Sequence, residues 1–215
     1  MTAVKKISRP AKTLNDLQIE YGVISRALPG EPECGDKYII EPSNNGVLVG
    51  VVDGLGHGNE AANAARIAIE TLKAHANESV TSLINHCHNN LKDTRGVVMC
   101  LASIRVSDET VTWIGVGNVE AMIVRADSTV VQRHEHIMLR GGVVGYNLPV
   151  LQATELRIAK GDLMIIKTDG LESGYGDEYP NKESAQHIAE RIGTKYIKGT
   201  DDALVLVLRY GSVMQ

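Results

Sequence analysis

The run VLVGVV at residues 47–52 is apolar at every position and ends at an aspartate. A strand with one wet face alternates apolar and polar side chains, so this unbroken run predicts a strand that is covered on both faces. Asp53 follows it, and Gly54, Gly56 and Gly58 form a turn before a helix. Such turns often bind phosphate, but the Asp53 carboxylate would repel phosphate unless a cation lay between them.

Two helices are predicted after this turn. In residues 59–77 the apolar side chains recur at helical spacing, and the many alanines among them indicate close packing against a sheet. The shared face consists of Ala61, Ala64, Ala65, Ala68, Ile69 and Leu72. Ser79 is suited to cap a second helix. The apolar stripe of that helix consists of Val80, Leu83, Ile84, Cys87 and Leu91.

Most of the remaining chain is predicted to form short strands joined by tight turns. The segments are 21–28, 37–41, 97–106, 111–117, 120–126, 154–159, 163–170 (ending in Asp169-Gly170) and 203–210, with a weaker one at 129–132. A further helix is predicted at 183–192, and 139–149 is predicted to be a loop. Tight turns favour an antiparallel meander over repeated βαβ units, so we expect an α+β fold.

Composition and charge narrow the class of protein. The chain has 215 residues, 43% of them hydrophobic, 22% charged, and a net charge of -4. We therefore expect one globular domain over 1–215, with 1–15 loosely attached, and neither nucleic acid nor an anionic membrane as partner. No apolar stretch reaches the roughly 18 to 20 residues that span a bilayer, and no signal-peptide core is present, so a cytoplasmic location is expected.

The cysteines point to no disulfide framework. Cys34, Cys87 and Cys100 are odd in number and lack the CxxC spacing of a zinc ribbon. We expect reduced, buried thiols.

Aspartates recur at the ends of the predicted strands. Asp36 precedes one strand, Asp53 and Asp169 follow apolar strands and are each followed by glycine, and Asp201 opens the last strand. A single Asp-Gly pair is more often a turn, but four such acids at strand ends can converge. Each pair would then repel by about 1 kcal/mol at 4 Å even in water. Oxygen-only ligation suits magnesium or manganese, and Gly54 lacks a Cβ that would keep its carbonyl from an ion.

These residues carry a family resemblance. Gly35-Asp36, VVDGLGHG (51–58), KTDGL (167–171) and DDALVLVL (201–208) together resemble the metal-dependent serine/threonine phosphatases of the PP2C type. The similarity is closer to their bacterial SpoIIE branch, where DGxGHG and a terminal DDxTxxVL recur, and it spans about residues 20–210. WIGVGNVEA (113–121) and the loop RGGVVGYNLP are most similar to the small stressosome phosphatases of that branch.

The resemblance implies a fold and a metal centre. The fold would be a four-layer αββα sandwich, in which helices flank two antiparallel sheets. Two manganese (or magnesium) ions would lie at one end. By motif match Asp53 would bridge both ions, the Gly54 carbonyl would bind one, Asp169 and Asp201 would hold one, and Asp36 would act through water.

The resemblance also implies a reaction. A water molecule between the two ions would lose a proton and attack the phosphoryl phosphorus in line, without a phosphoenzyme. The substrates would be phosphoserine or phosphothreonine on STAS-domain proteins of a stressosome, and dephosphorylation would reset a stress signal. Loops 139–149 and 172–182 are expected to contact the substrate, and we expect a monomer because no apolar stripe is left over.

Several positions depart from the family pattern. Leu55 stands where many relatives have histidine, which leaves His57 two residues later either as a catalytic acid or as a residue that shapes or caps the turn. Asn118 replaces the aspartate of relatives that bind a third metal, and Arg26 is only a surrogate for their phosphate-binding arginine. Asp201 matches the ligand position and Asp202 is expected to cap or support the site, although the motif match leaves open that Asp202 is the ligand instead.

Two other classes of function remain as alternatives. A dinucleotide-binding domain fits poorly, because GLGHG is not GxGxxG and Asp53 would repel a pyrophosphate. A non-catalytic protein-binding module with a phosphatase fold is the second alternative, against which the four aspartates argue.

The remaining histidines and the tryptophan carry little signal in the sequence. His86 and His88 point about 200° apart on a helix, and His134 and His136 lie near a loop. Neither pair has a third ligand nearby in sequence, so no zinc site is expected. Trp113 is either a core residue or a surface anchor.

Overall fold

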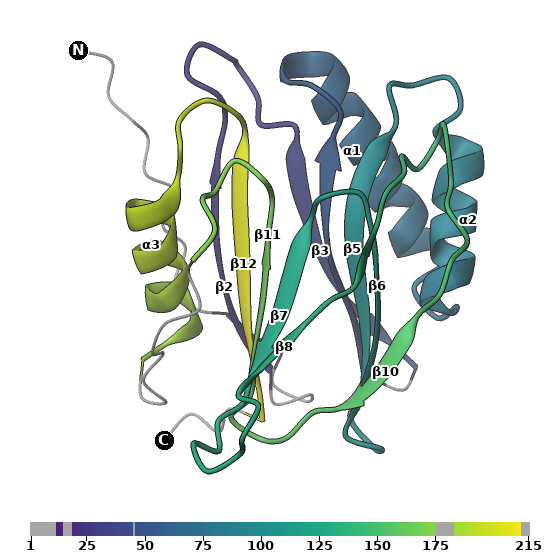
Figure 1. Cartoon of the computed structure of the whole chain (residues 1–215). Coiled ribbons are helices and arrows are strands. Elements are labelled where there is room, and N and C mark those ends of the chain that lie inside the picture. Colours follow the sequence, from purple (N-terminus) through teal and green to yellow (C-terminus); the bar gives the residue numbers. More distant parts are fainter. Residues whose placement is uncertain (1–11, 15–18, 45, 175–182, 212–215) are drawn as a thin grey trace.

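The computed structural model describes residues 12–14, 19–44, 46–174 and 183–211 (Figure 1). Within these ranges the chain forms two 6-stranded sheets. Apart from 12–14, the segment predicted to be loosely attached lies outside the described residues, as does 175–182 of the second expected substrate loop.

The two sheets are nearly all antiparallel. The first has the order β1-β2-β12-β11-β7-β8, from strands Lys12–Leu14 (β1), Ile19–Arg26 (β2), Ala203–Tyr210 (β12), Leu163–Lys167 (β11), Glu120–Val124 (β7) and His134–His136 (β8). The second has the order β10-β6-β5-β4-β3, from Thr154–Arg157 (β10), Thr110–Val116 (β6), Val97–Arg105 (β5), Gly46–Gly54 (β4) and Asp36–Ser43 (β3). Leu139–Arg140 (β9) adds a short parallel pairing to β6.

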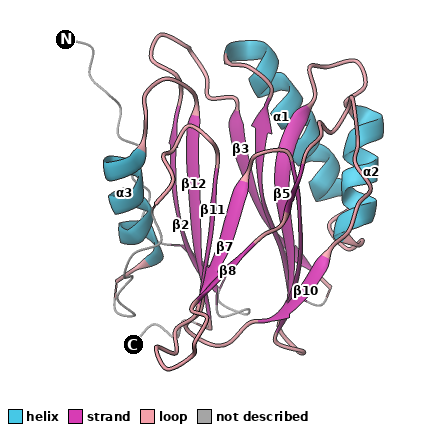
Figure 2. Cartoon of the chain, viewed as in Figure 1, coloured by secondary structure: helices cyan, strands magenta, loops and turns pink. Residues whose placement is uncertain are grey.

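Helices cover the outer face of each sheet, as Figure 2 shows. Gly58–Ala74 (α1) and Val80–Asn90 (α2) pack on the second sheet, and Ala185–Tyr196 (α3) packs on the first. A third apolar cluster fills the space between the sheets. The predicted four-layer αββα sandwich is therefore confirmed, with β9 as a small parallel exception.

Strand β4 shows why the unbroken apolar run of 47–52 was informative. Val47, Val49 and Val51 point into the core between the sheets, whereas Leu48 and Val52 pack under the helices. Both faces of β4 are thus buried, as predicted. Trp113 is also part of the core between the sheets, which decides between its two interpretations.

The helices begin and pack largely as predicted. All the alanines of the α1 face and Leu72 are buried, although Ile69 is only half-buried. The Ser79 hydroxyl accepts a hydrogen bond from the Ser82 N–H at 3.2 Å and caps α2. Helix α3 is predicted to end at residue 192, but it continues through Gly193 to Tyr196. Gly193 is tolerated because the helix lies against Ile24, and a Cβ there would come within 2.9 Å of that side chain.

The strand predicted at 129–132 is wrong. Asp127 Oδ1 accepts hydrogen bonds from the Thr129 N–H at 2.8 Å and from its hydroxyl at 2.7 Å, which closes a turn instead. The strand that pairs with β7 is β8.

Within the described ranges no helix is long and apolar enough to cross a membrane.

Candidate metal centre

The four predicted aspartates lie at one end of the sandwich. Asp36 begins β3 and is the register partner of Asp53 at the end of β4. Asp169 follows the end of β11, and Asp201 precedes the start of the antiparallel strand β12. Strand pairing therefore brings all four to the rim that lies uppermost in Figure 1.

Asp36 and Asp53 both face the space between the sheets. Because side chains alternate along a strand, Asp53 lies on the same face of β4 as Val51 and Val49, which belong to the core between the sheets. Asp36 likewise shares a face of β3 with Tyr38, which packs on that core. The two carboxyl groups thus close the upper end of the apolar layer.

Thr168 links Asp36 to the opposite sheet. Its buried hydroxyl donates to Asp36 Oδ2 at 2.8 Å and accepts from the Leu204 N–H at 2.9 Å. Thr168 was not predicted as a site residue. In the sequence, only its position directly before Asp169 could have pointed to it. Because side chains alternate along a strand, Thr168 lies on the same inward face as Ile166.

Burial and mutual repulsion perturb the two inward carboxyls. Burial, chiefly, raises the pKa of Asp36 to about 7, with added repulsion from Asp202, Asp201 and Asp169 and an opposing hydrogen bond from Thr168. Burial also raises the pKa of Asp53 to about 9, together with the charges of Asp36, Asp169 and Asp201. The carboxylates are therefore close enough to interact and are short of positive charge.

The donors at this rim fit hard divalent cations. They are carboxylate oxygens and backbone carbonyls, which magnesium and manganese prefer, and two ions would offset the excess negative charge. Within the described ranges, however, no three of these carboxylates offer oxygens that all lie within 4.8 Å of one another. Direct ligation of one ion by three of them would require the side chains to move closer together.

Asp202 has a structural role that sets it apart from Asp201. It is 3% exposed, and its two oxygens accept hydrogen bonds from the Leu28 N–H at 2.7 Å and the Gly35 N–H at 2.8 Å. These bonds fix the loop that leads into Asp36. Asp201 is only half-buried and accepts a bond from the Asp202 N–H at 2.8 Å. Asp201 is thus the freer of the two carboxylates to bind an ion.

Gly54 is required by packing, whatever its carbonyl binds. A Cβ at this position would lie 2.1 Å from the carbonyl oxygen of Ala61 in the first turns of α1. The Gly54 N–H also donates to the Gly35 carbonyl at 3.3 Å. The end of β4 therefore touches the helix backbone directly, which only glycine allows.

His57 occupies the N-cap position of α1, but its side chain does not cap the helix. Its side chain makes no capping hydrogen bond, and its Nδ1 instead pairs with Glu31 Oε1 at 2.6 Å. Capping by the His57 side chain is therefore wrong, whereas a role of this residue in shaping the turn stays a prediction. The imidazole is 56% exposed beside the glycine turn, and its catalytic role stays a prediction. Glu31 gave no signal in the sequence, because it reaches His57 from a separate loop.

Asp169 is held by two residues from other segments. Asn118 Nδ2 donates to Asp169 Oδ2 at 2.7 Å, so this neutral side chain lies at the rim as the resemblance implied. Lys198 Nζ donates to the Asp169 backbone carbonyl at 2.7 Å and was not predicted. Arg26 is exposed at the end of β2, in register with Ala203, and therefore also lies at this rim.

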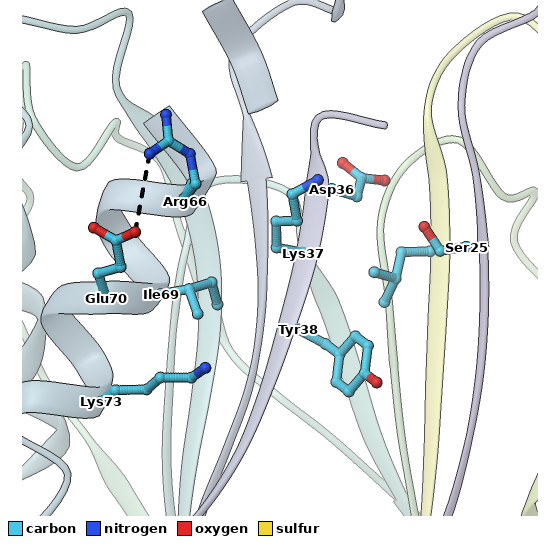
Figure 3. A pocket seen from close by; sticks show the side chains of 9 residues that line it. Ser25, Asp36, Lys37, Tyr38, Arg66, Ile69, Glu70 and Lys73 are labelled. Carbon is cyan, nitrogen blue, oxygen red and sulfur yellow. Dashed lines mark ion pairs between the residues drawn. The ribbon is translucent and has the colours of Figure 1, made fainter. Parts of the chain in front are cut away.

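A cavity of about 310 Å³ opens beside β3, the edge strand of the second sheet (Figure 3). Asp36 lies at its upper end and Lys73 of α1 at its lower end. Lys37 and Arg66 also line it, but Lys37 pairs with Glu33 at 2.8 Å and Arg66 with Glu70 at 3.9 Å. The cavity thus adjoins the carboxylate cluster and carries mixed charge.

The environment of the cysteines does not favour a nucleophilic thiolate. All three are free, and Cys87 and Cys100 are buried. Burial raises the pKa of the Cys34 thiol to about 11 and of the Cys87 thiol to about 12, which leaves little reactive thiolate at neutral pH. Cys87 and Cys100 are buried as expected, whereas Cys34 is only half-buried; the reduced state stays a prediction.

Comparisons with known proteins identify the family of the chain. Residues 43–211 match the family model of stage II sporulation protein E (SpoIIE). Phosphoserine phosphatase RsbX of Bacillus subtilis (strain 168) is 28% identical over 94 residues, which is 44% of this chain and 47% of RsbX, so the match spans about half of that relative.

Solved structures extend the similarity to most of the chain. One, described as "The bacterial stressosome: a modular system that has been adapted to control secondary messenger signaling", is 31% identical with a TM-score of 0.81, covering 89% of this chain and 99% of its own. RsbX in complex with magnesium is 21% identical with a TM-score of 0.79, and the match covers 94% of this chain and 98% of the RsbX chain. The serine/threonine phosphatase PstP of Mycobacterium tuberculosis shares the fold at 13% identity and a TM-score of 0.69, and the match covers 90% of this chain and 99% of the PstP chain. The chain therefore belongs to the SpoIIE family and has the fold of the PP2C phosphatases.

Proposed function

We propose that this protein is a metal-dependent protein serine/threonine phosphatase that acts on stressosome proteins. The observation that carries the proposal is the meeting of four aspartates from distant segments at one rim, where burial and repulsion raise the pKa of Asp36 and Asp53. The similarity to a protein named phosphoserine phosphatase supports the reaction class.

The groups at the rim have different proposed roles. Asp36, Asp53, Asp169, Asp201 and the Gly54 carbonyl are the groups we propose to hold two manganese or magnesium ions. When bound, such ions supply positive charge for the phosphoryl group and lower the pKa of a water molecule that attacks it. The chain's own contribution is orientation: its hydrogen bonds fix the ligands before the substrate arrives.

Three hydrogen-bonded supports provide that orientation. Thr168 holds Asp36, Asn118 holds Asp169, and Asp202 fixes the loop before Asp36. The apolar layer beneath the carboxylates keeps bulk water from the inner side of the site. We further propose that His57, exposed at the turn, donates a proton to the departing serine or threonine oxygen.

The loop at 139–149 is our candidate for contact with a folded substrate. It is tied to the rim, because the Gly117 N–H donates to the Arg140 carbonyl at 2.8 Å and the Gly145 N–H donates to His88 Nδ1 at 3.1 Å. Tyr146 is nevertheless 86% exposed, and Val150 just beyond the loop is 84% exposed. Exposed apolar side chains on a fixed loop suit protein recognition.

We propose phosphorylated STAS-domain proteins as the substrates. The proposal is supported by the solved relative described in a stressosome context and by the similarity to RsbX. The monomeric state expected from the sequence stays a prediction.

The test compares a small aryl phosphate with a phosphorylated STAS-domain protein. Both are assayed with manganese, with chelator, and with Asp169→Ala. We expect manganese-dependent release of phosphate from both substrates, and its loss with chelator or with the variant. Activity that ignores chelator would refute the metal mechanism, and activity on the aryl ester alone would remove the proposed partner. No activity under any condition would favour the non-catalytic binding module.

A further inference from the structure

A second cluster of metal-ligating side chains lies at the opposite end of the molecule. Among the described residues, one group of three His, Cys, Asp or Glu side chains has ligand atoms that all lie within 4.8 Å of one another: His75, Glu78 and His86. His75 follows α1, whose 17 residues begin at the aspartate rim. At a rise of about 1.5 Å per residue, the cluster is about 25 Å along the helix from that rim.

The two imidazoles face the same carboxylate. His75 Nδ1 lies 2.8 Å from Glu78 Oε1, and His86 Nε2 lies 2.9 Å from Glu78 Oε2. The two rings are stacked, with centroids 4.0 Å apart and an interplanar angle of 9°. Two nitrogens and one carboxylate are thus gathered at one point of the surface.

The backbone holds the three residues in place. The His75 N–H donates to the Leu72 carbonyl at the end of α1, and the Glu78 N–H donates to the His75 carbonyl at 2.9 Å. His86 lies on α2, which Ser79 caps. The Asn44 N–H donates to Asn77 Oδ1 at 2.8 Å and so ties the connecting turn to the β3–β4 turn. The backbone positions of the three residues are therefore fixed by the end of α1, the connecting turn and α2.

We propose that His75, Glu78 and His86 bind a Zn²⁺ ion, with water as the fourth ligand. Zinc accepts imidazole nitrogen and carboxylate oxygen at about 2.0 to 2.2 Å in tetrahedral geometry. The three side chains are partly exposed, at 36%, 41% and 39%, which leaves the two rings free to leave their stacked arrangement and turn their nitrogens toward one ion. The ion replaces the two His–Glu hydrogen bonds, and any proton that they share leaves to solvent.

This site differs in chemistry from the aspartate rim. Imidazole nitrogen suits zinc, whereas oxygen-only ligation suits magnesium or manganese. The sequence-based expectation of no zinc site considered the pairs His86/His88 and His134/His136 only. It missed His75, which the hairpin of α1 and α2 stacks against His86.

The test uses the metal-stripped full chain in saturating Mg²⁺, which occupies the oxygen-only centre. Co²⁺ is added and visible absorption is recorded, followed by displacement with Zn²⁺. We expect one equivalent of Co²⁺ with the strong absorption of a tetrahedral nitrogen-ligated ion. His75→Gln or His86→Gln should weaken Zn²⁺ binding by about tenfold or more, since even supporting groups of metal sites contribute that much.

His187→Gln is the matched control, because His187 is an exposed helical histidine that faces Glu183 at 3.8 Å. It should bind Zn²⁺ like the unaltered chain. Zn²⁺ at about 100 times its Kd should raise the Tm by about 5 to 10 °C, an effect that either glutamine variant loses. Absent tetrahedral absorption, or Zn²⁺ binding that survives both substitutions, would overturn the proposal. Neither readout depends on phosphatase activity.

Discussion

Asp201 and Asp202 are adjacent in sequence, but the structure predicts opposite consequences for their removal. Asp202→Ala deletes the acceptor for two backbone N–H groups, of Leu28 and Gly35. Each hydrogen bond to a charged group is worth about 1.5 to 3 kcal/mol, so the free energy of unfolding should fall by about 3 to 6 kcal/mol. That is a large part of the roughly 5 to 15 kcal/mol that stabilises a domain.

Asp201→Ala should leave the metal-free protein within about 1 kcal/mol of the original stability. It loses one hydrogen bond, to the Asp202 N–H, but also removes a charge that repels Asp36 and Asp53. Its effect should appear in manganese affinity, which we expect to drop by about tenfold or more.

The assay is urea unfolding in chelator at neutral pH, paired with calorimetric titration of Mn²⁺. Asp202→Asn serves as an intermediate variant, because its amide keeps one acceptor oxygen. An Asp202→Ala variant that unfolds like the original protein but loses metal affinity would contradict these roles. That result would move the ligand position from Asp201 to Asp202.

Three further predictions follow from the same contacts. Because the pKa of Asp36 is raised to about 7 and that of Asp53 to about 9, the folded metal-free protein binds protons more tightly than the unfolded chain. Its free energy of unfolding should therefore fall as pH rises from about 4 to about 9, and urea midpoints that rise instead would contradict this. Gly54→Ala should lower stability by about 1 to 3 kcal/mol or more, since its Cβ would overlap Ala61 of α1. Gly141→Ala, with no atom within 4 Å of its Cβ, is the control, and equal Tm values for the two variants would disprove the close contact. Thr168→Val should lower the free energy of unfolding by about 1 to 3 kcal/mol, because the Leu204 N–H loses its acceptor and Asp36 loses its donor. Thr168→Ser keeps the hydroxyl and is the control. A valine variant as stable as the serine variant would count against this role.

The sequence predicted the layers well because they depend on local periodicity. The apolar run before Asp53 could only be buried on both faces, and the alanines of α1 required a close sheet. Strand direction then placed Asp36 opposite Asp53, since antiparallel neighbours joined by a tight turn bring the start of one strand to the end of the next.

What could not be predicted depends on contacts between distant segments. Thr168 reaches Asp36 across the two sheets, a separation of 132 residues, and Lys198 reaches Asp169 from the loop after α3. The role of Asp202 requires knowing that two loop N–H groups converge on it. The prediction of a strand at 129–132 failed because the hydrogen bonds from Thr129 to Asp127 outweigh the β propensity of that segment.

We propose that the four aspartates at one rim bind a pair of divalent ions. Anomalous diffraction from crystals grown with Mn²⁺ tests it most directly. We expect two manganese peaks at the rim, with Asp53 between them, Asp169 and Asp201 beside one, and the Gly54 carbonyl beside one. Crystals that diffract well but show no peak within reach of Asp53 would contradict it.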